Sequence, residues 1–208
     1  MTQHHTVLII GGGAAGVSIA NNMRRQDATI DIAIVEPSEK HYYQPGFTIV
    51  GGGAYTLKQT LRNEADLIPA SVKWHKEYAD SFLPEENAVV LRSGDKLTYE
   101  YLVVCPGIQL DWHKIQGLAE TLGKNGVCSN YSPDTVEYTW ECVKNLESGT
   151  ALFTQPPMPI KCAGAPQKIV YLTADRLRKK GILDKLNLEF CNAGGVLFGV
   201  PFFCASLG

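Results

Sequence analysis

The residues of this sequence that could do chemistry fall into two groups, a glycine-rich turn near the start and a cysteine motif further on. The turn, Gly11-Gly12-Gly13-Ala14-Ala15-Gly16, has the spacing GxGxxG and follows the apolar run Thr6 to Ile10. In that setting the first glycine permits a tight turn, the second lets a pyrophosphate approach, and the third lets helix and strand pack closely. Glu36, at the end of the next apolar run, would accept hydrogen bonds from ribose hydroxyls. The pattern predicts a dinucleotide site; a glycine turn that binds nothing is the alternative.

The second candidate is Cys162, which lies between Lys161 and the run Ala163-Gly164-Ala165-Pro166. That run is typical of a helix start, where proline is tolerated in the first turn. A thiol at a helix N-terminus and beside a cation has its thiolate form favoured. A thiolate attacks disulfide or polysulfide sulfur and can donate electrons to a flavin. The motif makes Cys162 a candidate redox cysteine, with a buried, unreactive thiol as the alternative.

The remaining cysteines give weaker signals. No CxxC pair occurs, so a zinc ribbon or a thioredoxin-type motif is excluded, and the five histidines form no metal-ligand set. Cys128 stands in the loop before a predicted helix and is a candidate for a second catalytic cysteine or for a small loop residue. We expect the other four to be packing residues, with Cys105 nearest the expected cofactor: Cys105, Cys142, Cys191 and Cys204.

The elements that must position these residues alternate between strands and helices. The apolar run Thr6 to Ile10, a helix from Ala14 to about Arg25 and a strand Ile30 to Val35 make one βαβ unit. A second alternating unit has a strand Ala151 to Thr154, a helix Ala165 to Lys180 and a strand Leu186 to Cys191. Between them we expect strands at Val72 to Tyr78, Ala88 to Leu91 and Tyr101 to Cys105, a partly helical Leu57 to Leu67, and a helix that begins with Ser132 as its cap and ends at Ser148-Gly149.

The expected fold class is α/β, a Rossmann-type FAD-binding domain followed by the start of a second Rossmann-like domain. We place the first part of the FAD-binding domain at residues 1–112 and the partial second domain at residues 113–208. The sequence stops among apolar residues, Val196 to Phe203, without a polar tail, which predicts a truncated second domain.

Composition excludes several classes of partner. A net charge of -2 over 208 residues gives no electrostatic reason to expect nucleic acid or an anionic membrane surface. No apolar run is long enough to span a bilayer, and the first residues lack the basic and apolar regions of a secretory signal.

Four longer stretches indicate a particular family. Leu97 to Gly107 resembles the second flavoprotein signature, except that Cys-Pro-Gly replaces the usual Ala-Thr-Gly. The other three together resemble the sulfide:quinone oxidoreductase family within the flavoprotein disulfide reductase-like superfamily: Val35 to Gly46, Gly107 to Asp111 and Pro159 to Lys168. The resemblance is greatest to the branch that includes the mitochondrial enzyme, and it runs from about Thr6 to about Phe203.

The resemblance implies a role for individual residues. Cys162 matches one of two redox cysteines beside the flavin, and its partner is expected further along in complete relatives. Some relatives carry a third cysteine near Cys128. The implied FAD-binding residues are Gly11, Gly13, Ala14, Ala15, Gly16, Glu36, Gln44, Ala79 and Gly107.

The implied reaction is FAD-dependent oxidation of hydrogen sulfide to sulfane sulfur, with electrons passed to quinone and the sulfur passed to an acceptor. The family implies a peripheral protein of a respiratory membrane, bacterial or mitochondrial. Two alternatives remain at this stage. One is a related flavoprotein, such as that of flavocytochrome c sulfide dehydrogenase or a type 2 NADH dehydrogenase; the other is a truncated, non-catalytic FAD-binding fragment.

Overall fold

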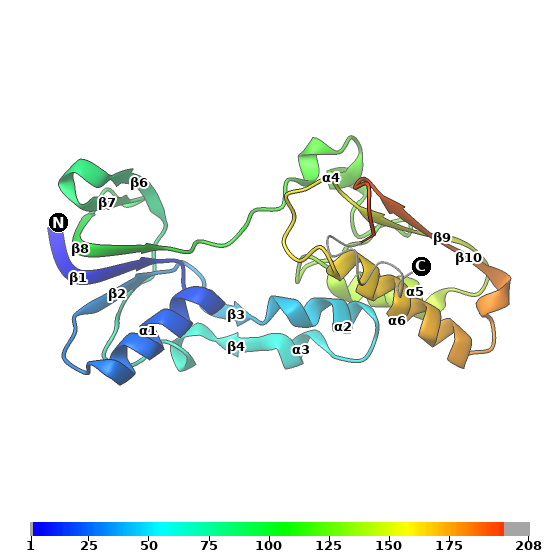
Figure 1. Cartoon of the computed structure of the whole chain (residues 1–208), viewed down its shortest axis with the longest axis horizontal. Coiled ribbons are helices and arrows are strands. Elements are labelled where there is room, and N and C mark those ends of the chain that lie inside the picture. Colours follow the sequence, from blue (N-terminus) through cyan, green and yellow to red (C-terminus); the bar gives the residue numbers. More distant parts are fainter. Residues whose placement is uncertain (1, 198–208) are drawn as a thin grey trace. The chain divides into compact units, whose positions relative to one another are not determined.

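The computed structural model describes residues 2–197, which form two compact units. The first unit comprises the residues up to Tyr43 together with Leu61–Gln109, and the second comprises Gln44–Thr60 together with the residues from Leu110 onward. Figure 1 labels most of the helices and strands of both. Cys204, expected to be a packing residue, and most of the apolar stretch that predicted a truncation lie outside the described residues.

The first unit is built on a six-stranded sheet with the order β5-β2-β1-β8-β7-β6. Parallel pairing joins β5, β2, β1 and β8, whereas β7 and β6 continue the sheet by antiparallel pairing. The two longest strands are in register along their whole length, from the pair Thr2 and Lys96 to the pair Ile10 and Val104. The strand bounds are β1 (Thr2–Ile10), β2 (Ile32–Val35), β5 (Lys73–His75), β6 (Ala79–Leu83), β7 (Ala88–Leu91) and β8 (Lys96–Val104).

Both faces of the central strands are covered, which explains their continuous apolar sequence. On one face Ile9 and Ile34 pack with Ala20 of helix α1 (Ala14–Gln26). On the other face Leu8 and Val35 pack with side chains of β7 and β8. The first βαβ unit is therefore confirmed, with a helix on one side and antiparallel strands on the other.

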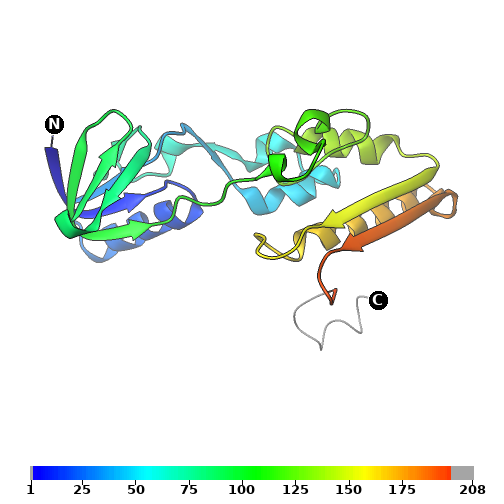
Figure 2. The ribbon, with the colours of Figure 1, turned by 90° about the horizontal axis from the view of Figure 1, so that it is seen from above.

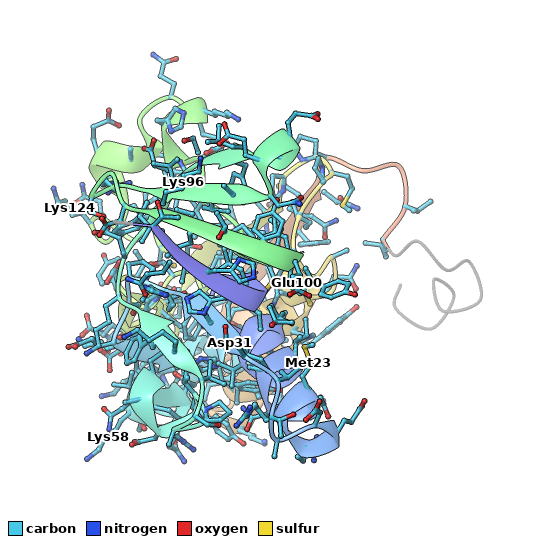
Figure 3. The ribbon with its side chains drawn as sticks, turned by 90° about the vertical axis from the view of Figure 1, so that its left-hand side faces the viewer. Met23, Asp31, Lys58, Lys96, Glu100 and Lys124 are labelled. Carbon is cyan, nitrogen blue, oxygen red and sulfur yellow. The ribbon has the colours of Figure 1, made fainter. Side chains whose placement is uncertain are left out.

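Polar side chains from β1, β5 and the residue before β2 form a cluster in this unit. His5, which is buried, places its Nδ1 atom 3.0 Å from a carboxylate oxygen of Asp31 and its Nε2 atom 3.1 Å from Nε2 of His75. Asp31 lies beside β1 in Figure 3 and also accepts a hydrogen bond from the backbone N–H of Thr6. Burial, followed by the nearby His5, lowers the pKa of His75.

A short antiparallel hairpin, β3 (Lys40–Tyr42) with β4 (Leu61–Asn63), flanks the segment that belongs to the second unit. That segment contains α2 (Phe47–Gly51) and α3 (Leu57–Thr60). The sequence boundary at residue 112 assigned this segment to the first domain, but its apolar side chains pack in the second unit. The prediction that Leu57 to Leu67 is partly helical is confirmed only for α3 and for a 3-10 turn at Glu64–Asp66.

The second unit contains a parallel strand pair crossed by a long helix. Strands β9 (Gly149–Gln155) and β10 (Leu186–Asn192) are in register throughout, and α6 (Ala165–Lys179) connects them and lies along one face of the pair (Figure 2). This confirms the second βαβ unit. The unit also contains α4 (Leu118–Thr121) and α5 (Val136–Asn145).

Helix α2 packs against α5 and α6 through small residues. A Cβ atom on Gly51 would lie 3.2 Å from a methyl of Thr139 and 3.3 Å from Ile169, and one on Gly52 would lie 2.8 Å from Leu172. Gly53 has φ +77°, and a Cβ there would lie 2.2 Å from the ring of Trp140. These close approaches explain the run of three glycines, which the sequence indicated only as a loop.

Helix α5 begins later than predicted. Ser132 is not its cap; the helix starts at Val136, after Thr135. The Ser132 hydroxyl accepts a hydrogen bond from the backbone N–H of Asp134 at 3.2 Å, and its carbonyl accepts from Thr135 and Val136. A serine that bonds to the backbone two residues on makes a local turn instead of a helix cap, so the turn precedes the helix.

Candidate active site

The glycine-rich turn adopts a conformation that only glycine permits at two positions. Gly11 has φ +101°, and a Cβ atom on it would lie 2.3 Å from the carbonyl oxygen of Cys105. A Cβ atom on Gly16 would lie 1.9 Å from the carbonyl oxygen of Gly11. No side chain fits at either distance, so the tight turn and the close helix–strand packing predicted from the spacing are both present.

Gly13 differs from its neighbours because the space beside it is open. A Cβ atom there would meet nothing within 4 Å. Gly13 caps α1 without any side-chain hydrogen bond, and the first turn of α1 carries no acidic residue. The backbone N–H groups of a first helical turn have no partners within the helix, and the helix dipole favours an anion there. Ala14 and Ala15 lie in that turn, so this corner fits a pyrophosphate group.

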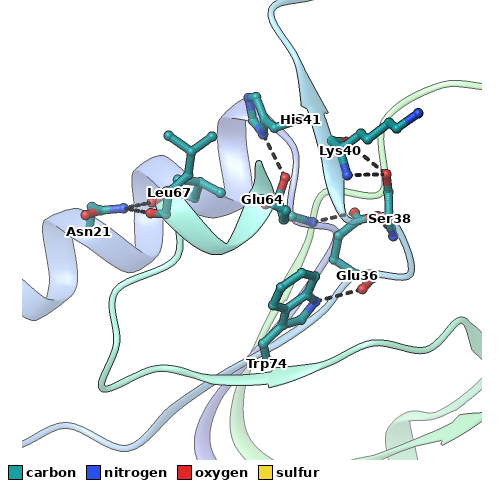
Figure 4. A network of polar contacts seen from close by, with 10 residues as sticks. Asn21, Glu36, Ser38, Lys40, His41, Glu64, Leu67 and Trp74 are labelled. Atoms are coloured by element: carbon teal, nitrogen blue, oxygen red, sulfur yellow. Dashed lines mark hydrogen bonds and ion pairs between the residues drawn. The ribbon is translucent and has the colours of Figure 1, made fainter. Parts of the chain in front are cut away.

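Glu36 adjoins the turn at the end of β2. One of its carboxylate oxygens accepts a hydrogen bond from the Gly12 N–H and the other from the Ser38 N–H, each at 2.8 Å. The Glu36 carbonyl accepts from the Trp74 indole at 2.8 Å, as Figure 4 shows. A carboxylate has about four acceptor positions, so capacity is left for ribose hydroxyls.

Beneath the turn lies a pair that the sequence analysis missed. Glu64 is 1% exposed, and its Oε2 atom is 3.0 Å from Nδ1 of His41 (Figure 4). Its Oε1 atom is buried without a hydrogen-bond partner, and a Cβ on Gly12 would lie 2.8 Å from it. Burial raises the pKa of Glu64, against the opposing effect of His41. The two residues are 23 positions apart, and no spacing rule connects them.

Two further predicted FAD-binding residues, Gly107 and Ala79, and one predicted packing residue, Cys105, also belong to the first unit. Gly107 has φ +82°, with open space where a Cβ would stand, and Ala79 begins β6. The Cys105 thiol donates to the Gly11 carbonyl at 3.6 Å, and burial raises its pKa. These properties agree with the expected packing role of Cys105.

The second unit contains a shallow, open pocket. It brings together a predicted cofactor residue, Gln44, and the predicted redox residue, Cys162, which are far apart in the sequence. The polar side chains that line it are Gln44, Thr48, Asn130, Tyr131, Lys161, Cys162 and Lys168. Asn130 is held by a 2.8 Å hydrogen bond from its amide to the hydroxyl of Thr48.

Cys162 stands in the connection that leads into α6. It is exposed and has φ +61°, and its carbonyl accepts a hydrogen bond from the Ala165 N–H at 2.9 Å. The ammonium of Lys168 donates to its sulfur at 3.7 Å. The sequence analysis expected the neighbouring cation to be Lys161, but the donor comes from the second turn of the helix. Long side chains on a helix lean towards its N-terminus, which brings Lys168 back to the sulfur.

Tyr131 holds the backbone around this cysteine. Its hydroxyl lies 3.1 Å from the carbonyl oxygen of Lys161 and 3.3 Å from that of Cys162. Burial, reinforced by charge on Cys162, raises the pKa of Tyr131 to about 12, so the hydroxyl is a donor at any physiological pH.

Cys128 is not among the residues that line this pocket. It lies near Thr139 and Cys142 of the same unit, and burial raises its pKa to about 11, so it is a neutral thiol near pH 7. Its catalytic role stays a prediction. Cys191, expected to be a packing residue, is exposed on β10.

The first unit has a Rossmann-type cradle that fits a dinucleotide, and the second unit presents an accessible cysteine before a helix N-terminus; the cradle places the chain in the class of dinucleotide-binding oxidoreductases. A sequence model of the family described as "Pyridine nucleotide-disulphide oxidoreductase" matches residues 5–139, and the chain belongs to that family. Its members are flavoproteins, and the predicted cofactor, FAD, and the Rossmann-type fold class are both confirmed.

Named relatives confirm the narrower resemblance. The chain is 49% identical over 196 residues to a mitochondrial sulfide:quinone oxidoreductase of Dictyostelium discoideum, covering 93% of this chain and 43% of the relative. It is 44% identical over 205 residues to the one of Mus musculus, covering 99% and 46%. The crystal structure of sulfide:quinone oxidoreductase from Aquifex aeolicus has a similar fold, with TM-score 0.78 and 24% identity over 94% of this chain and 44% of that one.

The chain spans about half the length of the curated relatives it matches. Within residues 2–197, no helix is long and apolar enough to cross a membrane. The same part of the chain contains no cluster of three or more histidine, cysteine or acidic side chains that could hold a metal ion.

Proposed function

We propose that this chain serves the FAD-dependent oxidation of hydrogen sulfide to sulfane sulfur, with electron transfer to quinone. The observation that carries the proposal is the exposed Cys162 at the start of α6, with the Lys168 ammonium 3.7 Å from its sulfur. The names of the relatives support the choice of sulfide and quinone as substrates.

The first unit would hold the cofactor. Gly13, Ala14 and Ala15 offer open space and backbone N–H donors for the pyrophosphate, and Glu36 offers acceptors for the ribose hydroxyls. Gly11 and Gly16 would permit the turn itself. When bound, FAD accepts the two electrons that sulfide oxidation releases and delivers them to the quinone.

Cys162 would act as one of a pair of redox cysteines, with a partner that the resemblance places further along the longer relatives. Hydrosulfide attacks a sulfur of the bridge between the two cysteines. One S–S bond forms and one breaks, so that one cysteine carries a persulfide and the other leaves as a thiolate. A sulfur acceptor would then remove the outer sulfur and leave that cysteine as a thiolate. The two thiolates would re-form the disulfide bond, and the electron pair released by that oxidation would go to the flavin. Lys168 would stabilise negative charge on Cys162 during these exchanges.

The location would be the surface of a respiratory membrane, because quinones dissolve in the lipid and the relatives are named mitochondrial. The pocket also distinguishes this proposal from a type 2 NADH dehydrogenase, whose hydride transfer needs no cysteine at the position of Cys162.

The experiment is an anaerobic absorbance titration with sulfide of the FAD-loaded protein at the full length of its relatives, because the resemblance places the partner of Cys162 beyond this chain. We expect sulfide to bleach the flavin bands in the wild type and in the Cys191→Ser control, which removes an exposed cysteine outside the pocket. We expect Cys162→Ser to remain yellow. Flavin that bleaches with NADH but not with sulfide would contradict the proposal. If Cys162→Ser bleached as much as the wild type, another residue would have to pass the electrons from sulfide to the flavin. Cys128→Ser would then test the second candidate cysteine.

A further inference from the structure

The backbone of Cys162 has an unusual conformation for a residue with a side chain. Its φ of +61° lies in the left-handed region, and only two other non-glycine residues among those described, Asn87 and Asn125, share a positive φ. Asparagine adopts this region readily, whereas cysteine has no side-chain bond to compensate for it. A strained residue of this kind persists only where its surroundings hold it.

The Tyr131 hydroxyl is placed to hold it. The carbonyl of Lys161 belongs to the peptide plane before the Cα atom of Cys162, and the carbonyl of Cys162 belongs to the plane after it. Tyr131 approaches both oxygens, at 3.1 and 3.3 Å, and its single proton can be shared between them. Fixing the two planes on either side of one Cα atom fixes both φ and ψ at that residue.

The direction of the thiol follows from those two angles. With φ at +61°, the side chain leaves the backbone on the side where the ammonium of Lys168 meets the sulfur at 3.7 Å. Both hydrogen bonds of the Tyr131 hydroxyl go to backbone carbonyl oxygens, so through these bonds it acts on the thiol by way of the backbone.

We propose that Tyr131 is a positioning residue for Cys162: its hydroxyl clamps the two peptide planes that flank this cysteine and so keeps the sulfur beside Lys168 in the pocket. The use of that sulfur in sulfide oxidation rests on the proposed function. The clamp does not depend on the proposed function, because it consists only of the hydrogen bonds from Tyr131 to the backbone and their effect on the thiol.

The test measures how fast iodoacetamide alkylates Cys162, followed by mass spectrometry of its peptide, in the wild type and in Tyr131→Phe. Phenylalanine keeps the ring and removes only the hydroxyl. At pH 7 we expect alkylation to slow by about two- to fivefold, the range for losing one favourable contact to an exposed charge. At high ionic strength we expect the two rates to converge, because salt screens the attraction between an exposed ammonium and the reacting sulfur.

The matched control is Tyr138→Phe, which removes a hydroxyl that accepts a 2.9 Å hydrogen bond from the Gly126 N–H in the same unit, away from the residues that line the pocket. We expect it to leave the alkylation rate of Cys162 unchanged. Melting curves of both variants check that the second unit is folded.

A double-mutant cycle with Lys168→Met makes the test specific. If Tyr131 acts by holding the sulfur beside Lys168, Tyr131→Phe has no further effect once Lys168 is replaced. An unchanged alkylation rate in Tyr131→Phe overturns the proposal. So does a Tyr131→Phe change that slows alkylation equally in the wild type and in Lys168→Met, or a Tyr131→Phe chain that does not fold. Because alkylation needs neither FAD nor sulfide, a failure of sulfide oxidation leaves this result intact.

Discussion

The ammonium of Lys168 lies 3.7 Å from the sulfur of Cys162, although the two residues are six positions apart in the sequence. The cysteine precedes α6, whereas the lysine belongs to the second turn of that helix. The helix thus contributes two positive features to one sulfur, the N–H groups of its first turn and a cation that reaches back past them.

Lys168→Met should therefore slow the reaction of Cys162 with iodoacetamide at pH 7 by about two- to fivefold, the range for an exposed charge pair. The matched variant is Lys161→Met, which removes the other lysine that lines the pocket and is directly adjacent to the cysteine. We expect it to have little effect, because the observed donor to the sulfur is Lys168. A larger effect of Lys161→Met would mean that the lysine adjacent in the sequence, and not the lysine on α6, accelerates the reaction of Cys162.

Gly16→Ala should destabilise the first unit, because the new methyl carbon would lie 1.9 Å from the Gly11 carbonyl oxygen. We expect a loss on the order of 3 kcal/mol in the free energy of unfolding, measured by urea denaturation.

Gly13→Ala is the matched change, since its methyl carbon would meet nothing within 4 Å. It should change stability by less than about 0.5 kcal/mol and weaken FAD binding at least roughly tenfold, measured by flavin fluorescence, because the methyl fills the phosphate position. Normal FAD affinity in Gly13→Ala would refute the assignment of this corner to the pyrophosphate.

Stability should fall in mild acid because of His75. Burial and the neighbouring His5 and Lys73 lower its pKa below 6.5, while Asp95 acts in the opposite direction. Below pH 6.5 the unfolded chain therefore binds more protons than the folded chain, and the free energy of unfolding falls until the folded pKa is passed. His75→Gln should flatten this part of the stability–pH curve. Replacing the exposed His113 by glutamine should leave the curve unchanged; equal flattening by both would remove His75 as the cause.

Glu64 should have an effect in the opposite direction. Its raised pKa means that the folded chain keeps this proton above pH 4.5, where the unfolded chain has released it. The contribution of Glu64 to stability is therefore largest in acid and is lost as the pH rises from 4.5 through its folded pKa. Glu64→Gln should remove that loss. The difference in the free energy of unfolding between this variant and the wild type should therefore change with pH. A difference that is constant with pH would show that the carboxyl does not titrate in this range.

The first βαβ unit could be predicted from sequence because each of its signals is local. The apolar run up to Ile10, the glycines and Glu36 lie within 36 residues, and their roles depend on backbone geometry that glycine spacing determines. Cys162 could be located in the same way, from the helix start that follows it.

The partners of these residues could not be predicted, because each contact joins distant segments. His41 and Glu64 meet only after β3 pairs with β4, and Tyr131 reaches the carbonyl of Cys162 across 31 positions. Lys168 could not be predicted for the same reason: adjacency in the sequence indicated Lys161, and only the direction of side chains on α6 adds Lys168 as a donor to the sulfur.

The packing of α2 against α5 and α6 sets an order of events during synthesis. Gly51 and Gly52 leave the ribosome early, but the side chains that cover them, Thr139, Ile169 and Leu172, are made much later. The gap of roughly 120 residues between Gly52 and Leu172 corresponds to about 6 to 24 s at ~5–20 residues per second. Phe47 and Val50, buried in the finished protein, are thus exposed on the nascent chain for that interval, which makes this segment a natural binding site for chaperones.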